Sequence, residues 1–446
     1  MRQLSFIFVL LLIATSVGAQ STGELQQYRR SALAEMMVYH SEDEFGAQIY
    51  EAFSTKPPAD KYDNHNFGFD VIDNDSIPNV KKKSHGLIKA QIGKNLNSSD
   101  VKKNGEMLCK MLNQAEIAKI MVAKWFGMTF DENFDINTAT FNVDLIQQRG
   151  LYNASELDVA LAEHTARGIA QLEDAGEELI SNTFLLVSDI TYVTAEEKAA
   201  IAKTVMNVVG GVLDAFLGDN SGTKMAKLGG EIADSFTGFT VKTNSYLFRL
   251  DWNDSIAAIF YNNYYTSTPN PEKINAFIDD LTTFRLKFVA HEYEYDDKSV
   301  IVGEYDRKEL IKMVCARSVD KNIAALQLAY EDFKVKTPVY AVVTDDKGKV
   351  VGYSAKIGMK EGITENSKFQ VIERYIDPKT NKTKYRYIAS LKPIKGQVWD
   401  NRYNAVTEKS TGSTLTATTF KKTGGGEILP GMLIIEGKYK KVEGTP

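Results

Sequence analysis

One apolar run constrains the fold more than any other part of the chain. Residues 182–193, NTFLLVSDITYV, combine consecutive apolar side chains with β-branched ones, which favours a buried strand. Further strand patterns occur at residues 26–38, 67–72, 141–147, 241–252 and 284–295. Helical periodicity occurs at residues 44–53, 105–126, 270–281 and 306–333, the last with a break near Ser318. This mixture predicts an α/β or α+β body.

The character of the chain changes between residues 334 and 338. Helical propensity stops there, and Pro338 cannot continue a helix. About six short strand patterns follow, with turn signals at residues 345–348 and 377–381. We therefore expect an α/β body over residues 20–334, which can divide into two subdomains and carries a helical insert over 194–238. A small antiparallel β-barrel or sandwich domain over residues 335–446 completes the prediction.

The N-terminus has the three parts of an export signal. Arg2 precedes an apolar stretch at residues 4–14, and Val17-Gly18-Ala19 supplies small residues before a cleavage site. We expect a signal peptide over residues 1–19 and a mature chain that begins at Gln20, in the periplasm or secreted. No later segment reaches about 18 uninterrupted apolar residues, so we expect no transmembrane helix.

Charge is distributed unevenly along the chain. The whole sequence has a net charge of −5, yet from Lys336 onward 20 Lys and Arg stand against 11 Asp and Glu. This basic part could bind an acidic polymer. It could equally attract the acidic remainder of the chain or keep the surface solvated.

Sequence motifs for catalysis are missing. The chain has no G-x-S-x-G, H-E-x-x-H or C-x-x-C motif, and its five histidines form no spaced pair. Asp189 meets the expected end of the strand at 182–193 without a phosphate-binding loop beside it, so we interpret it as a turn residue. We expect no catalytic residue, no metal and no cofactor.

Four aromatic residues form the first candidate binding site. Tyrosine and tryptophan at a surface can stack on a sugar, so Trp252, Tyr261, Tyr264 and Tyr265 are candidates for glycan binding. The alternative is that they belong to the core.

Other candidates are short patterns. Gly210 and Gly211, within a predicted helix, would permit close approach to another subunit or envelope protein, or to the protein's own sheet. Ser76 and Ser255 lie in Asp-Ser-Ile tripeptides, a candidate O-glycosylation acceptor. The two cysteines, Cys109 and Cys315, could pair in an oxidising compartment or remain two separate buried thiols.

Two segments resemble known envelope modules. The residues FNVDLIQQRGLY, with the helix and strand that end in NTFLLVSDITYV, are similar to the α/β unit of the curli secretion channel family and of the TolB N-terminal domain. The residues GMKEGITENSKFQVIER, with LPGMLI, are similar to the small C-terminal barrel of the flagellar assembly protein FlgT. More broadly, the chain resembles exported proteins of unknown function from Gram-negative gut anaerobes.

The export signal, the missing catalytic motifs and the two-part architecture lead us to expect a non-enzymatic exported or periplasmic cell-envelope protein that acts through protein–protein contacts. Its expected partner is an envelope protein or a second copy of itself, and not a nucleic acid. A glycan- or surface-polymer-binding protein is the second hypothesis. A hydrolase without a visible motif is the third.

Overall fold

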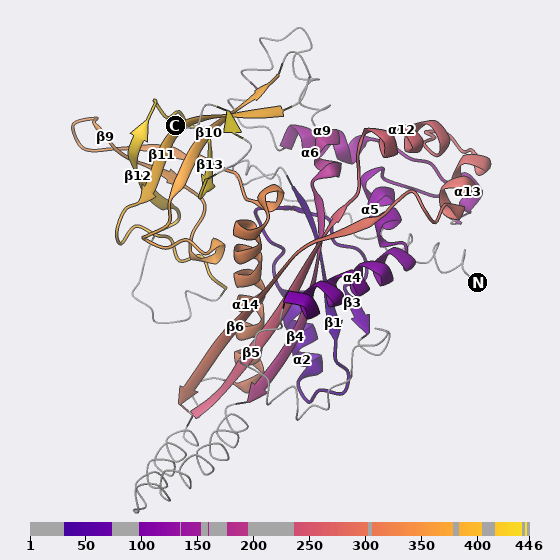
Figure 1. The fold of residues 1–446 in the computed structure, drawn as a ribbon, viewed down its shortest axis with the longest axis horizontal. Helices are drawn as coiled ribbons and strands as arrows, with labels where there is room; N and C mark the ends of the chain where they lie inside the picture. The colour runs from indigo at the N-terminus through magenta and orange to yellow at the C-terminus, as the bar shows by residue number, and fades with distance from the viewer. Residues whose placement is uncertain are drawn as a thin grey trace, which may run out of the picture.

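The computed structural model describes two sheets with helices around the first (Figure 1). The described residues are 31–73, 98–133, 135–152, 159, 176–194, 236–301, 306–377, 383–403, 415–438, 442 and 443. The predicted signal peptide and most of the predicted helical insert lie outside these residues.

The first sheet is mixed. Its strand order is β2-β1-β4-β5-β6, and β3 also pairs with β1. β1 runs parallel to β2, β3 and β4, whereas β5 runs antiparallel to both of its neighbours, β4 and β6. The strands are β1 (Ala32–Tyr39), β2 (Asp63–Asn64), β3 (Val71–Asp73), β4 (Thr183–Thr194), β5 (Phe236–Leu250) and β6 (Leu286–Ile301).

Helices cover both faces of this sheet. One face is covered by α4 (Ser98–Gln114), α5 (Ile117–Trp125), α6 (Asp144–Tyr152), α9 (Gly176–Ser181), α12 (Asp254–Asn263) and α13 (Pro271–Asp279). The other is covered by α2 (Gly46–Thr55) and α14 (Arg307–Ala329). Leu185 and Val187 of β4 point to the first face, and Phe184 and Leu186 to the second. The continuous apolar run that opened the sequence analysis is therefore explained, because β4 is buried on both sides.

Three local expectations were wrong. Residues 141–147 do not form a strand, since α6 begins at Asp144, whose amide donates to Asn142 Oδ1. α14 does not break at Ser318, because this serine is buried against β5, where its hydroxyl contacts the Thr243 hydroxyl and donates to the Cys315 carbonyl. Asp189 does not end its strand, since β4 continues to Thr194.

The second sheet curls like half of a barrel (Figure 1), which confirms the expected fold class. Its order is β7-β13-β10-β11-β12-β9-β8, and β14 pairs with β11. The strands are β7 (Thr337–Pro338), β8 (Ala341–Thr344), β9 (Val350–Ala355), β10 (Phe369–Ile376), β11 (Thr383–Pro393), β12 (Thr418–Gly425), β13 (Leu433–Glu436) and β14 (Val442–Glu443). The core inside the curl includes Val371, Leu391, Phe420 and Ile434.

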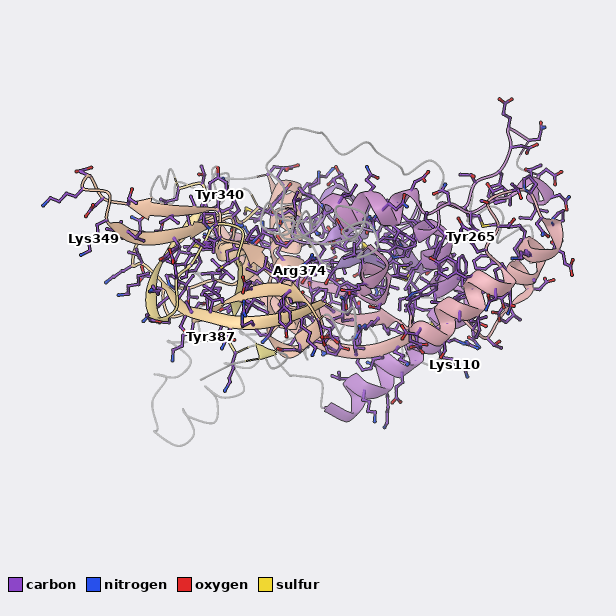
Figure 2. The ribbon with its side chains drawn as sticks, turned by 90° about the horizontal axis from the view of Figure 1, so that it is seen from above. Lys110, Tyr265, Tyr340, Lys349, Arg374 and Tyr387 are labelled. Carbon is purple, nitrogen blue, oxygen red and sulfur yellow. The ribbon has the colours of Figure 1, made fainter. Side chains whose placement is uncertain are left out.

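The two expected hairpins are confirmed. β8 and β9 pair through a turn in which Asp345 Oδ1 accepts from the amides of Lys347 and Lys349, each at 2.9 Å. β10 and β11 pair from Phe369 to Ile376. In Figure 2, Lys349 marks the tip of the β8–β9 hairpin at one end of the molecule, and Tyr265 lies in the helical layer toward the other end.

α14 connects the two sheets. Its Arg317 guanidinium donates to the Tyr403 carbonyl at 2.7 and 3.0 Å. Further along the helix, Ala324 lies so close to Gly362 that a Cβ at that glycine would be 3.2 Å from the alanine methyl. Gly362 also has a φ of 77°, which favours glycine. The second sheet is therefore docked on the helical layer of the first.

Candidate functional site

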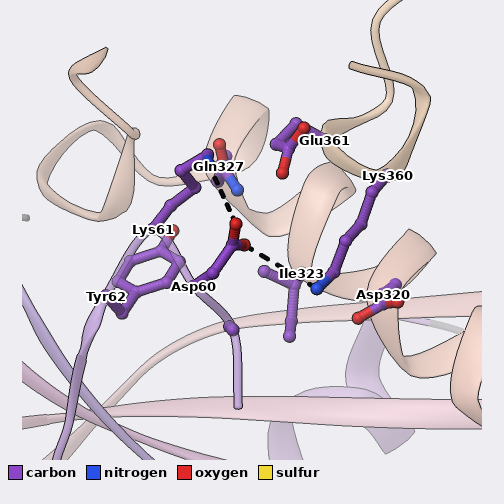
Figure 3. Close-up of a pocket in the computed structure, with 9 residues that line it drawn as sticks. Asp60, Lys61, Tyr62, Asp320, Ile323, Gln327, Lys360 and Glu361 are labelled. Carbon is purple, nitrogen blue, oxygen red and sulfur yellow. Dashed lines mark hydrogen bonds and ion pairs between the residues drawn. The ribbon is translucent and has the colours of Figure 1, made fainter. Parts of the chain in front are cut away.

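The charged side chains that line a hollow between α14 and the second sheet form the candidate site, which we call the joint (Figure 3). The hollow measures about 250 Å³, its open mouth included. Its walls come from the loop after α2, from α14 and from the turn η4 (Met359–Glu361). The lining residues are Ala59, Asp60, Lys61, Tyr62, Asp320, Ile323, Gln327, Lys360 and Glu361.

A buried ion pair fixes the loop that forms the first wall. α2 ends at Thr55 because Pro57 forces the residue before it, Lys56, into an extended conformation. Lys56 Nζ lies 3.0 and 3.2 Å from the two carboxylate oxygens of Glu35 on β1. The two side chains are only 4% and 6% exposed. Tyr62 closes the loop, since its hydroxyl donates to the Phe333 carbonyl at 2.8 Å.

Asp60 links the loop to the second sheet. Its carboxylate lies 3.0 Å from Lys61 Nζ and 3.7 Å from Lys360 Nζ (Figure 3). Burial raises the pKa of Asp60, but the charges of Lys61 and Lys360 outweigh this and hold the pKa below its ordinary value. Asp60 is thus a carboxylate shared by one lysine from each side of the joint.

Glu361 holds the turn that carries Lys360. Its Oε2 accepts from the Gly358 amide at 2.6 Å and from Asn401 Nδ2 at 2.9 Å. Burial raises the pKa of Glu361, against the opposing charge of Lys61. In the turn GMKEG, Lys360 therefore faces the body, whereas Glu361 forms its hydrogen bonds within the second module.

Asp320 is the least satisfied group of the joint. It is 8% exposed, and its Oδ1 has no hydrogen-bond partner within the part of the chain that the structure describes. Burial raises its pKa, although the charges of Lys56 and Lys360 oppose the rise. Four carboxylates face three ammonium groups here: Glu35, Asp60, Asp320 and Glu361 against Lys56, Lys61 and Lys360. These charges hold the two modules together. Because one carboxylate is in excess over the ammonium groups, the stability of the joint depends on pH.

Asp189 lies in an ion pair away from the joint. Its Oδ1 is 2.7 Å from His40 Nε2, in the segment that follows β1. Burial lowers the pKa of His40, but the hydrogen bond and the charge of Asp189 outweigh this and raise it. The carboxylate expected at a turn instead ties β4 to the segment after β1.

The four candidate aromatics come together in the core. Tyr264 is buried, and its hydroxyl donates to Asp280 Oδ2 at 3.0 Å. Trp252, Tyr261 and Tyr265 are partly buried and pack around Phe126. Their placement corresponds to the core alternative of the sequence analysis.

The remaining candidate residues are scattered. Ser255 is exposed in the first turn of α12, where its amide donates to Asn253 Oδ1 at 3.0 Å. Ser76, Gly210 and Gly211 lie outside the described residues.

Of the two alternatives for Cys109 and Cys315, the structure shows two free thiols. Cys109 packs on one face of the first sheet and Cys315 on the other. A sheet thus separates the sulfur atoms, and the alternative of two separate thiols holds.

Sequence reasoning missed the joint. In the sequence, Lys360 and Glu361 stand out only as part of the segment that resembles the FlgT barrel. The usable signal was the turn GMKEG, whose glycines bracket two charges.

Comparisons with known proteins do not assign the chain to a family. No protein-family model matches the chain, and neither does any curated protein. Within the described residues, no helix is long and apolar enough to cross a membrane. In the same residues, no group of three or more His, Cys, Asp and Glu side chains is arranged to hold a metal ion.

Proposed function

We propose that this chain is an exported cell-envelope protein that acts without catalysis, through contacts with another envelope protein or a second copy of itself. The observation that carries the proposal is the edge strand β6. β6 stands last in the order of the first sheet and pairs with β5 over nearly its whole length of 16 residues.

An edge of this length is suited to strand addition. Sixteen residues extend over about 50 Å. At the start of β6 the main chain of Leu286 bonds to Asn113 of α4. Within the described residues, no strand pairs with the outer side of β6. Natural edge strands are usually short or covered, since their unpaired amides and carbonyls bind other strands. The sequence HEYEYDDK within β6 is rich in charged residues, and such residues disfavour non-specific pairing of an edge with strands of other proteins. A partner that adds a strand here would gain main-chain hydrogen bonds.

The β8–β9 hairpin offers a second contact. Val350 and Val351 are consecutive in β9 and are 47% and 48% exposed, so both faces of the hairpin are in contact with solvent near its tip. The joint holds the second sheet on the body through Arg317, Asp60 and Lys360. The hairpin and β6 therefore belong to one docked assembly.

Proline substitutions at two adjacent positions of β6 test the proposal. Amide directions alternate along a strand, so in one of the variants Glu292→Pro and Tyr293→Pro the proline removes an outward amide only. The proline in the other variant removes a hydrogen bond between β5 and β6, and this variant is recognised because it unfolds. The matched control is Asp346→Pro, at the second position of the β8–β9 turn, where proline is favoured.

The measurements are light scattering of the purified mature protein and pull-down from envelope extract after cross-linking. We expect the folded β6 variant to lose self-association or its cross-linked partner by about tenfold or more, and Asp346→Pro to retain it. Equal association of the folded β6 variant and the wild type would contradict the proposal.

A further inference from the structure

The outer face of the second sheet carries a row of lysines, which we call the lysine row. In β11 and β12, Lys392 and Lys421 are direct cross-strand partners. Their neighbours Leu391 and Phe420 point into the core, so both lysines point outward. Phe369 of β10 pairs with Leu391, and continuing that register places Lys368 beside Lys392.

The positive charges of the lysine row are not neutralised by neighbouring carboxylates of the described residues. Among the described residues, no carboxylate forms an ion pair with Lys368, Lys392 or Lys421. Like charges placed directly opposite each other in a sheet are destabilising. The exposed Lys395 lies just beyond the end of β11, and the part of the chain from Lys336 onward has a strong excess of positive charge. Lys368, Lys392 and Lys421, at neighbouring positions of the three adjacent strands β10, β11 and β12, therefore place positive charge on one face of the sheet.

We propose that the lysine row is a binding surface for an acidic polysaccharide, a polymer with carboxylate or sulfate groups along its length. A linear polyanion crossing the three strands would contact successive ammonium groups and relieve their mutual repulsion. The proposal is separate from the protein contacts of β6, because it concerns the other sheet.

The composition of the row favours a polysaccharide over a nucleic acid. Proteins that recognise phosphate backbones and bases use the planar guanidinium of arginine and the stacking of aromatic rings. The row contains neither, only lysines, which act as point charges. This preference also rests on the proposed export, since polysaccharides are constituents of the cell envelope.

The test compares two pairs of substitutions in the full mature chain. Lys392→Gln/Lys421→Gln removes two charges from the row. Lys103→Gln/Lys110→Gln removes two charges from exposed positions of α4 on the body and is the matched control. Lys392→Arg/Lys421→Arg keeps the charge. Binding is measured to immobilised heparin and polygalacturonate, and to a duplex DNA of equal charge, in a sodium chloride gradient.

We expect the glutamine pair in the row to weaken polysaccharide binding by about tenfold or more at low salt, while the control and the arginine pair retain it. The thermal midpoint of the row variant should stay level or rise, since repulsion is removed. If the double variant does not fold, Lys421→Gln alone, at an exposed position, must still weaken binding. Failure of the wild type to bind either polysaccharide, equal losses in the control, or tighter binding of DNA would each overturn the proposal.

Discussion

Removing Lys56 tests whether the buried pair with Glu35 is essential to the loop that forms the joint. In Lys56→Met the carboxylate of Glu35 stays buried, and its remaining hydrogen bond is from the Ala59 amide at 3.4 Å. Breaking a buried ion pair from one side costs about 3–5 kcal/mol, whereas replacing both members by apolar side chains is often neutral. We therefore expect Lys56→Met to lose about 3–5 kcal/mol of unfolding free energy. Glu35→Met/Lys56→Met should recover to within about 1 kcal/mol of wild type.

The assay is urea unfolding followed by the tryptophan fluorescence of the chain, whose three tryptophans include the fully buried Trp125. An unchanged slope against urea shows that the same surface unfolds in each variant. Lys312→Met is the control, because its partner Glu51 is 55% exposed and solvent screens the pair; it should change stability little. A loss below about 1 kcal/mol in Lys56→Met, or a double variant as unstable as the single one, would refute the reasoning.

Three further predictions concern the joint, the second sheet and the N-terminus. Burial raises the pKa of Asp320 and Glu361, so the stability that these groups contribute is present below their ordinary pKa and is lost as pH rises through the raised one. Asp320→Asn should therefore increase the thermal midpoint near neutral pH and flatten its pH profile, and an unchanged profile would exclude Asp320 as the responsive group. A fragment of residues 337–446 should fold alone, with a β-type circular dichroism spectrum and cooperative unfolding, whereas a disordered spectrum would show that its strands need the body. Mass spectrometry of the exported protein should find Gln20 as the first residue, and a chain that retains Met1 would contradict export.

The sequence was informative where the periodicity was strong. The run FLLV in β4 predicted a buried strand because both faces of that strand are covered. Asn270 and Pro271 marked the start of α13 because the Asn270 side chain accepts from the Lys273 amide. In both cases the local sequence and the tertiary environment require the same conformation.

The joint was not predictable in the same way. Asp60, Asp320 and Lys360 are far apart in the sequence, and each alone resembles an ordinary surface charge. Only the docking of the second sheet on α14 buries them together. The misassigned residues 141–147 have the same origin, since a short apolar run fits a strand and a helix equally well and the packing of α6 decides between them.

The position of β1 in its sheet has a consequence for how the chain reaches its native state. Ala32 at the start of β1 pairs with Thr183 of β4, and β4 is flanked in turn by β5. The first strand to be synthesised therefore has no main-chain partner in β4 until a far later part of the chain has emerged from the ribosome. Pairing over such a sequence separation is slow, so the centre of the first sheet is completed late. Such late completion is compatible with the proposed export through a channel that threads extended chains.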